Sequence, residues 1–157
     1  MNTNKILILG VGNVLMGDEG VGISSINELS KIELPENVEV LDGGTGGFHL
    51  LSYFENYSKI ILIDAALDGK PAGEVAIIEP KFSKDFPKSL SAHDIGLKDL
   101  LESAQLLNSF PKIYLITISV AQFQNMGMEL SKEVADSIPK VIHEVKVIIK
   151  KISESDH

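Results

Sequence analysis

Apolar residues along the chain gather in short runs that alternate with segments of helical periodicity. Runs of this kind are typical of strands buried in a sheet. Five runs predict strands, at 5–9, 38–41, 60–63, 74–78 and 113–118. The connection before the 74–78 run is too short for a crossover helix, so we expect this strand to pair antiparallel with the strand before it.

Helical segments lie between and after these strands. Helices are expected over 21–31, 48–54, 91–107 and 134–152. The third of these has apolar residues at i, i+3, i+4 and i+7 counted from Leu97, and Ser91 with Asp94 forms a helix-start signature within it. Pro139 predicts a kink or a restart in the last and longest helix.

The alternation of strands and helices predicts a single domain over residues 1–157. The expected fold class is α/β, a three-layer α/β/α sandwich around a mostly parallel five-stranded sheet with one antiparallel strand. With 44% of its 157 residues hydrophobic, such a domain can bury a solid core. No apolar run approaches the length of about 18–20 residues that spans a bilayer.

Net charge and cysteine content exclude several kinds of partner and of functional site. The net charge of −8 argues against nucleic acid and anionic membranes as partners. All basic residues are lysines, so no guanidinium group can bind phosphate or carboxylate in a bidentate manner. The absence of cysteine excludes a disulfide framework, a thiolate metal site and a thiol nucleophile, and it favours a cytoplasmic location.

Acidic residues follow the predicted parallel strands, where open α/β sheets bind their ligands. The glycine-rich stretch GVGNVLMGDEGVG carries Asp18 and Glu19 after the first strand. Asp42 follows the second strand and Asp64 the third, while His93 stands at the start of the helix expected over 91–107. A phosphate site would need backbone N–H groups and cations at these positions. The acids instead predict a cation or a protonated group as ligand.

A nucleotide- or dinucleotide-binding α/β enzyme remains an alternative. The fingerprint GxGxxG, placed on Gly10 and Gly12, puts Leu15 at the third glycine, where its side chain breaks the close packing of helix on strand. Asp42 nevertheless stands where a ribose-binding acid would be expected. The phosphate-loop pattern GxxxxGK[ST] is absent from the sequence.

Glu19, Asp64 and His93 come from separate segments that we expect at one rim of the sheet. Two carboxylates and one imidazole can hold a divalent transition metal, and a helix N-terminus would keep His93 neutral. A set with a single His and no Cys predicts weak affinity, so that the site fills only when another molecule shares the metal. Each residue taken alone could equally be a helix cap or a loop bridge.

Four motifs, GVGNVLMGDEGVG, LDGGTGG, ILIDAA and SAHDIGL, together resemble the hydrogenase maturation endopeptidases. These are nickel-dependent proteases that process the C-terminus of [NiFe]-hydrogenase large subunits, and the resemblance covers essentially the whole chain. It implies a peptidase that recognises the nickel-loaded precursor of a large subunit and removes its C-terminal extension. The nickel is then carried by the substrate, and no nucleotide is needed.

The resemblance also implies roles for individual residues. The metal site of the family maps onto Glu19, Asp64 and His93, and its substrate-binding DGGT loop maps onto Asp42, Gly43, Gly44 and Thr45. Asp64 and Glu19 are the candidate catalytic residues. Two routes to hydrolysis stay open: nickel polarises the carbonyl or activates water, or Asp64 or another acid acts as general base.

Overall fold

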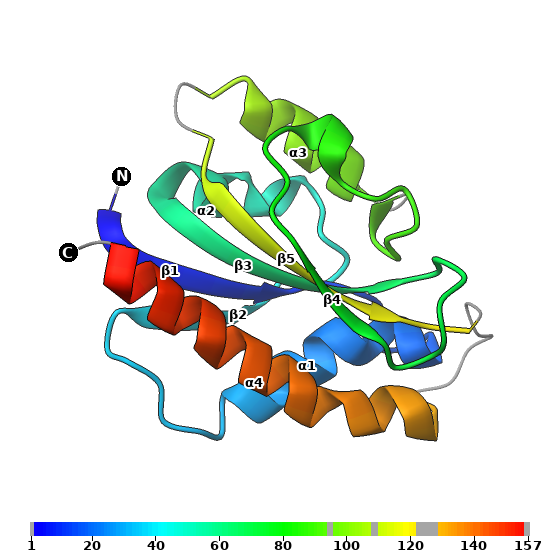
Figure 1. Ribbon diagram of the computed structural model, residues 1–157. Helices are drawn as coiled ribbons and strands as arrows, with labels where there is room; N and C mark the ends of the chain where they lie inside the picture. Colours follow the sequence, from blue (N-terminus) through cyan, green and yellow to red (C-terminus); the bar gives the residue numbers. More distant parts are fainter. Residues whose placement is uncertain (1, 94–95, 108–109, 122–128, 156–157) are drawn as a thin grey trace.

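The computed structural model describes residues 2–93, 96–107, 110–121 and 129–155. Its strands form one sheet (Figure 1), in the order β2 (Val38–Asp42), β1 (Asn2–Gly10), β3 (Tyr57–Ala66), β5 (Lys112–Ser119) and β4 (Val75–Ile78). β1 is parallel to β2 and β3, and β5 is parallel to β3, whereas β4 is antiparallel to β5. The predicted five-stranded, mostly parallel sheet with one antiparallel strand is confirmed.

The predicted partner of β4 is wrong. β4 pairs with β5 and not with β3, the strand that precedes it in sequence. β5 is buried along nearly its whole length, whereas β4 is only partly buried and its Ile77 is 39% exposed. A strand that is apolar on both faces belongs in the middle of a covered sheet. β5 therefore lies next to β3, and β4 forms the edge.

Helices cover both faces of the sheet (Figure 1). α1 (Val21–Leu29) and α4 (Lys132–Ser155) pack on one face, and α2 (Leu51–Asn56) and α3 (Leu97–Gln105) pack on the other. Alternate residues of β1 enter the two cores, because successive side chains of a strand point to opposite faces. Ile6 and Ile8 join the core under α1 and α4, and Leu7 and Leu9 join the core under α2 and α3. The three-layer prediction is confirmed.

Two helices differ from their predictions. α4 continues through Pro139 without a restart, with Val134 and Val141 buried on either side of it. α3 begins at Leu97, so His93 precedes this helix instead of opening it. Gly96 has φ 139°, a backbone conformation that no right-handed helix contains, and this stops α3 from extending further back. Asp94, the second residue of the predicted helix start, lies outside the described residues.

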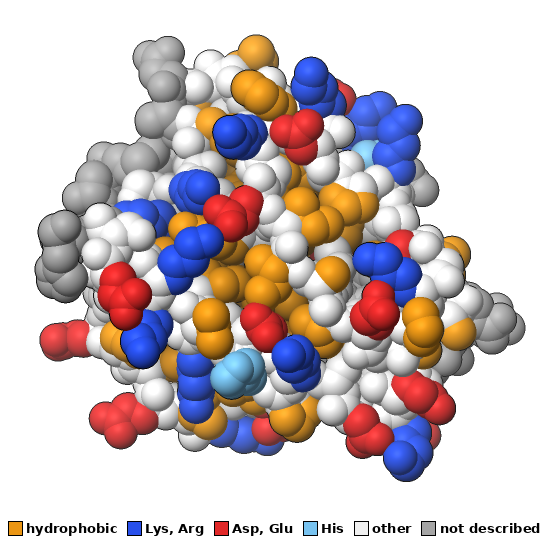
Figure 2. Space-filling model, viewed as in Figure 1, with side chains coloured by type: hydrophobic (Ala, Val, Ile, Leu, Met, Phe, Trp, Pro, Cys, Tyr) orange, Lys and Arg blue, Asp and Glu red, His pale blue; other side chains and the backbone are white. Residues whose placement is uncertain are grey.

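The surface beside α4 and β4 mixes apolar and charged side chains. In the view of Figure 2, hydrophobic side chains occupy the middle of this face, and lysines and acidic residues of both signs are interspersed around them. No single sign of charge therefore dominates it. Among the described residues, no helix combines the length and the apolar character that crossing a bilayer would require.

Gly22 brings α1 into direct contact with the sheet. A Cβ atom at this position would meet the carbonyl oxygen of Val11 and would lie 2.5 Å from that of Ile63. Leu15, the third position of the dinucleotide fingerprint, is instead 50% exposed in a loop. The close packing that the fingerprint assigns to its third glycine is thus provided by Gly22, which comes after the two acids.

We expect Gly22→Ala to destabilise the fold by about 1–3 kcal/mol, because the added methyl group has to displace backbone atoms. Gly47→Ala is the control, since a Cβ there would meet its nearest atom, Nδ1 of His49, at an ordinary 3.5 Å. Urea unfolding should show little loss of stability, or a small gain, in the control. Equal stabilities of the two variants would contradict the packing role of Gly22.

Candidate functional site

The direction in which the chain adds strands to the sheet reverses after β2. From β1 the chain moves outward to β2 and then returns across β1 to form β3, so β2 and β3 flank β1 on opposite sides. Loops diverge at such a switch point, and the crevice at the carboxyl ends of the strands is the usual ligand site. Just past the last β1–β3 pair, the N–H of Val11 donates to the carbonyl of Ile63 at 3.0 Å. The glycine-rich turn therefore starts at the edge of this crevice.

The 3₁₀ turn η1 (Gly17–Gly20) carries the two adjacent acids of the glycine-rich stretch. The loop folds back on itself at Gly12, where φ is 146° and a side chain would collide with the carbonyl group of Glu19. The N–H of Asn13 donates to that same carbonyl at 3.2 Å. Asp18 and Glu19 are 2% and 7% exposed as whole residues, so both are largely covered by the protein.

The two acids have different surroundings. The carboxylate of Asp18 accepts the N–H of Ser131 at 2.7 Å and its hydroxyl at 2.8 Å, which fixes the chain just before α4. The carboxylate of Glu19 has no hydrogen-bond or ion-pair partner among the residues that the structure describes. Burial raises the pKa of Glu19. Asp18 is thus a structural residue, while Glu19 is left able to bind a ligand.

Asp64 is completely buried within β3. Its Oδ1 atom accepts the N–H of Ala65 at 2.8 Å and the hydroxyl of Ser91 at 2.6 Å, and its Oδ2 atom accepts the N–H of Ala92 at 3.1 Å. Burial raises the pKa of Asp64 to about 7 against the opposing effect of these donors, and the negative charge of Glu19 adds to the rise. Asp64 therefore changes its protonation near neutral pH.

The segment that leads to α3 brings His93 to this site. The N–H of Ser91 donates to the carbonyl of Ala65 at 2.8 Å, and the N–H of Leu67 donates to that of Ser89 at 2.9 Å. Residues 89–91 thus pair with the end of β3, beyond its last pair with β1. Nδ1 of His93 is buried and has no hydrogen-bond partner in the described part of the chain. Such a group costs about 1–3 kcal/mol in the free protein unless a partner satisfies it.

The DGGT loop is hydrogen-bonded to the first glycine turn. The carboxylate of Asp42, an exposed residue at the end of β2, accepts the N–H of Gly44 at 2.8 Å. The N–H of Gly43 donates to the carbonyl of Gly10, and the N–H of Gly12 donates to that of Gly44, both at 2.7 Å. The loops that follow β1 and β2 are therefore held together by backbone hydrogen bonds.

The second half of this loop approaches the His93 segment. A Cβ atom at Gly46 would lie 3.5 Å from Cβ of Ala92, and one at Gly96 would lie 3.1 Å from Cα of Gly47. Thr45, between the two glycine pairs, is half-buried. The loop thus runs from the glycine turn to the residues that flank His93.

The predicted site residues are only partly brought together. The charge of Glu19 acts on Asp64, and Asp64 is hydrogen-bonded to the segment that carries His93. Within residues 2–93, 96–107, 110–121 and 129–155, no three His, Asp or Glu side chains form a group that could hold a metal ion. The metal-binding role of the three residues therefore stays a prediction, as do the catalytic and substrate-binding roles.

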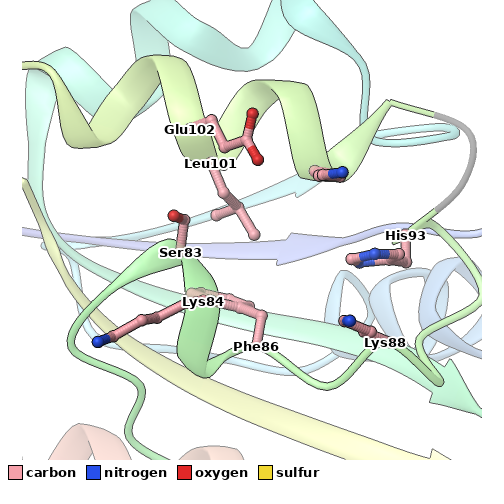
Figure 3. Close-up of a pocket in the computed structure, with 8 residues that line it drawn as sticks. Ser83, Lys84, Phe86, Lys88, His93, Leu101 and Glu102 are labelled. Atoms are coloured by element: carbon pink, nitrogen blue, oxygen red, sulfur yellow. The ribbon is translucent and has the colours of Figure 1, made fainter.

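A pocket of about 400 Å³ lies beside His93 (Figure 3). Its lining includes the side chains of Lys84, Lys88, Phe86, Lys98 and Leu101. In Figure 3 the ring of His93 and the side chain of Lys88 extend into the same space, and Leu101 points into it from α3. Neither this pocket nor the bond from Ser91 to Asp64 is predictable from the sequence, because both join segments that no local pattern connects.

Comparison with known proteins identifies relatives of the chain. Residues 23–148 match the family model described as hydrogenase maturation protease. The hydrogenase expression/formation protein HupD of Bradyrhizobium diazoefficiens is 34% identical over 141 residues, which cover 86% of this chain and 72% of that protein. The hydrogenase 2 maturation protease of Escherichia coli is 38% identical over 111 residues, which cover 69% of this chain and 68% of that protein.

A solved structure shares the fold. The hydrogenase maturating endopeptidase HybD from Escherichia coli superposes with a TM-score of 0.84 at 30% sequence identity, over 94% of this chain and 93% of that chain. These comparisons support the peptidase interpretation of the sequence and give no support to the nucleotide-binding alternative.

Asp18→Ala should lower the free energy of unfolding by about 2–3 kcal/mol, because it leaves two donors of Ser131 without their charged acceptor. Asp42→Ala removes the same charge and one bond at an exposed site, and it should cost about 1 kcal/mol or less. Urea unfolding of both variants measures the difference. An Asp18→Ala variant no less stable than the Asp42→Ala control would refute the anchoring of α4.

Asp64→Asn tests the raised pKa of Asp64. With a pKa of about 7 in the folded chain against an ordinary value of 3.8, folded Asp64 retains a proton that the unfolded chain has released. The free energy of unfolding of wild type should therefore fall as pH rises from about 4 to 7 and then level off. Between pH 5 and 8 the variant should lose less stability than wild type, by on the order of 2 kcal/mol. Parallel stability curves from urea titrations would show that the pKa is not raised.

Proposed function

The chain belongs to the hydrogenase maturation protease family, and we propose that it removes the C-terminal extension from the nickel-loaded precursor of a [NiFe]-hydrogenase large subunit. Membership of the family makes the protein a peptidase. The observation that carries the proposal is the family match over residues 23–148, which include Asp42, Asp64 and His93.

Nickel enters this proposal as part of the substrate. Its recognition is assigned to Glu19, Asp64 and His93, and carboxylate and imidazole groups suit a divalent transition metal. Two observations support the assignment: the Glu19 carboxylate has no partner among the described residues, and the same holds for the buried Nδ1 of His93. Among the described residues, Oδ2 of Asp64 accepts one hydrogen bond, from Ala92, which leaves a further lone pair of that atom for a ligand.

Hydrolysis requires a water molecule that loses a proton as it attacks the scissile carbonyl. A general base works best when its pKa lies near the working pH, and the pKa of Asp64 is about 7. Asp64 is accordingly the proposed proton acceptor on the route in which its carboxylate does not itself bind the nickel, and Glu19 both holds the substrate and raises the pKa of Asp64. The nickel of the substrate, acting on the carbonyl or on the water, is the other route.

The DGGT loop is assigned to the backbone of the substrate. Gly44 has φ 57°, and a Cβ atom there would have no neighbour within 4 Å, so the space around it is open to a partner chain. Backbone hydrogen bonds join this loop to the first glycine turn, which supports Asp42, Gly43 and Thr45 as further contacts of the substrate.

The proposed macromolecular partner is the precursor protein, with neither nucleic acid nor membrane as a partner. The net charge of −8 supports this choice, because both excluded surfaces are anionic. Residues 1–157 are treated as one protease domain, and the proposed location is cytoplasmic, as the cysteine-free sequence favours.

Glu19→Gln and His93→Ala should each slow cleavage of the nickel-loaded precursor at least about 10-fold, because each removes a ligand for nickel. Glu36→Gln and His143→Ala, at exposed positions, are the matched controls and should cleave like wild type. Mass spectrometry of the processed subunit provides the readout, and thermal melts confirm folding.

Nickel-free precursor should stay intact with wild type and with all four variants. Full processing by both Glu19→Gln and His93→Ala, or equal processing of nickel-free precursor by wild type, would rule out recognition through nickel.

A further inference from the structure

The pocket beside His93 carries positive charge in an acidic protein. We call it the lysine pocket and define it by Lys84, Lys88, Lys98 and His93. Among the described residues, its lining has three lysines and one acid, Glu102, while the whole chain has a net charge of −8. A local excess of one sign in a concave site attracts ligands of the opposite sign.

The lysines of this pocket are free to bind a ligand. Some lysines elsewhere are paired, as Lys5 is with Glu39 at 2.8 Å and Lys112 with Glu79 at 3.1 Å. None of the three pocket lysines forms an ion pair with any residue that the structure describes. The Nζ atom of Lys84 instead lies 5.7 Å from the centre of the Phe82 ring.

The lysine pocket adjoins the candidate active site through His93. Ala92, the residue before His93, donates its N–H to Asp64, so the pocket begins one residue from the contacts of the buried carboxylate. Phe86 and Leu101, which are 4% and 1% exposed, give the pocket an apolar floor on which a peptide can lie. A peptide held beside His93 therefore has this pocket next to it.

We propose that the lysine pocket binds a carboxylate of the C-terminal extension that the enzyme removes. This inference rests on the proposed function. An extension at the end of a protein necessarily ends in an α-carboxylate, and its acidic side chains, where present, offer the same chemistry. The volume of about 400 Å³ lies in the range of pockets that bury small ligands, so the pocket holds only a few residues of the extension.

Such binding fixes the direction of the substrate. With the carboxylate among the lysines, the extension lies on the His93 side of the scissile bond, and the large subunit lies on the side of the two glycine loops. The chain has no arginine, so the contacts are single ammonium charges without bidentate geometry. We therefore expect recognition of charge with little dependence on the sequence of the extension.

The test is steady-state cleavage of the nickel-loaded precursor by the double variant Lys88→Gln/Lys98→Gln. The control is Lys146→Gln/Lys150→Gln, which removes two exposed charges from α4 and leaves the net charge equal. The pocket variant should raise KM about 5-fold with kcat nearly unchanged, since the carboxylate is bound equally in the ground and transition states. The control should have the kinetics of wild type. An unchanged KM in the pocket variant, while wild type cleaves the precursor, overturns the proposal.

Two altered precursors identify the source of the carboxylate. One has its C-terminus amidated by ligation, and the other has every acidic side chain of the extension changed to the amide. One of these precursors lacks the carboxylate that the pocket binds. Wild type should cleave that precursor with the raised KM, and the pocket variant should raise its KM no further. If neither alteration removes the difference between wild type and pocket variant, the lysines do not bind a carboxylate. If wild type cleaves no precursor at all, the proposed function itself fails.

Discussion

A buried carboxylate at the end of the central strand β3 is the constraint on which the site depends. Moving an ionised carboxyl group out of water costs several kcal/mol unless donors surround it. Asp64 obtains one donor from its own strand, at Ala65, and two from the segment before α3, at Ser91 and Ala92. Satisfying this group therefore ties residues 91–92 to β3. His93 is positioned as a consequence.

The neighbouring acids of the glycine-rich turn differ in their hydrogen-bond partners. Asp18 has strong donors from Ser131 and holds the start of α4, the helix that covers one face of the sheet. Glu19, one residue later and also nearly buried, has no partner among the described residues. Because burial raises the pKa of Glu19, a ligand that supplies positive charge would stabilise its ionised form. Asp18 thus stabilises the loop, and Glu19 is the candidate for binding a ligand.

The residues on the two sides of His93 carry opposite charges. On one side are Glu19 and Asp64, which favour a cation, and on the other are the three lysines of the pocket, which favour an anion. A substrate that carries a metal centre near its cleavage point and a carboxylate at its end matches this arrangement in both parts. For the proposed substrate, binding in the reverse direction would place like charges together, which favours a single orientation.

The sequence by itself determined the strands, most of the helices and the acids at the strand ends. These follow from local periodicity and from the rule that ligands bind at the carboxyl ends of parallel strands. Only the tertiary structure decided that β5 separates β4 from β3, that α3 starts after Gly96, and which donors Asp64 receives. It also decided that lysines from the loop around Lys84 and from α3 share one pocket. Such choices depend on contacts between residues far apart in the chain, whose energies no local pattern records.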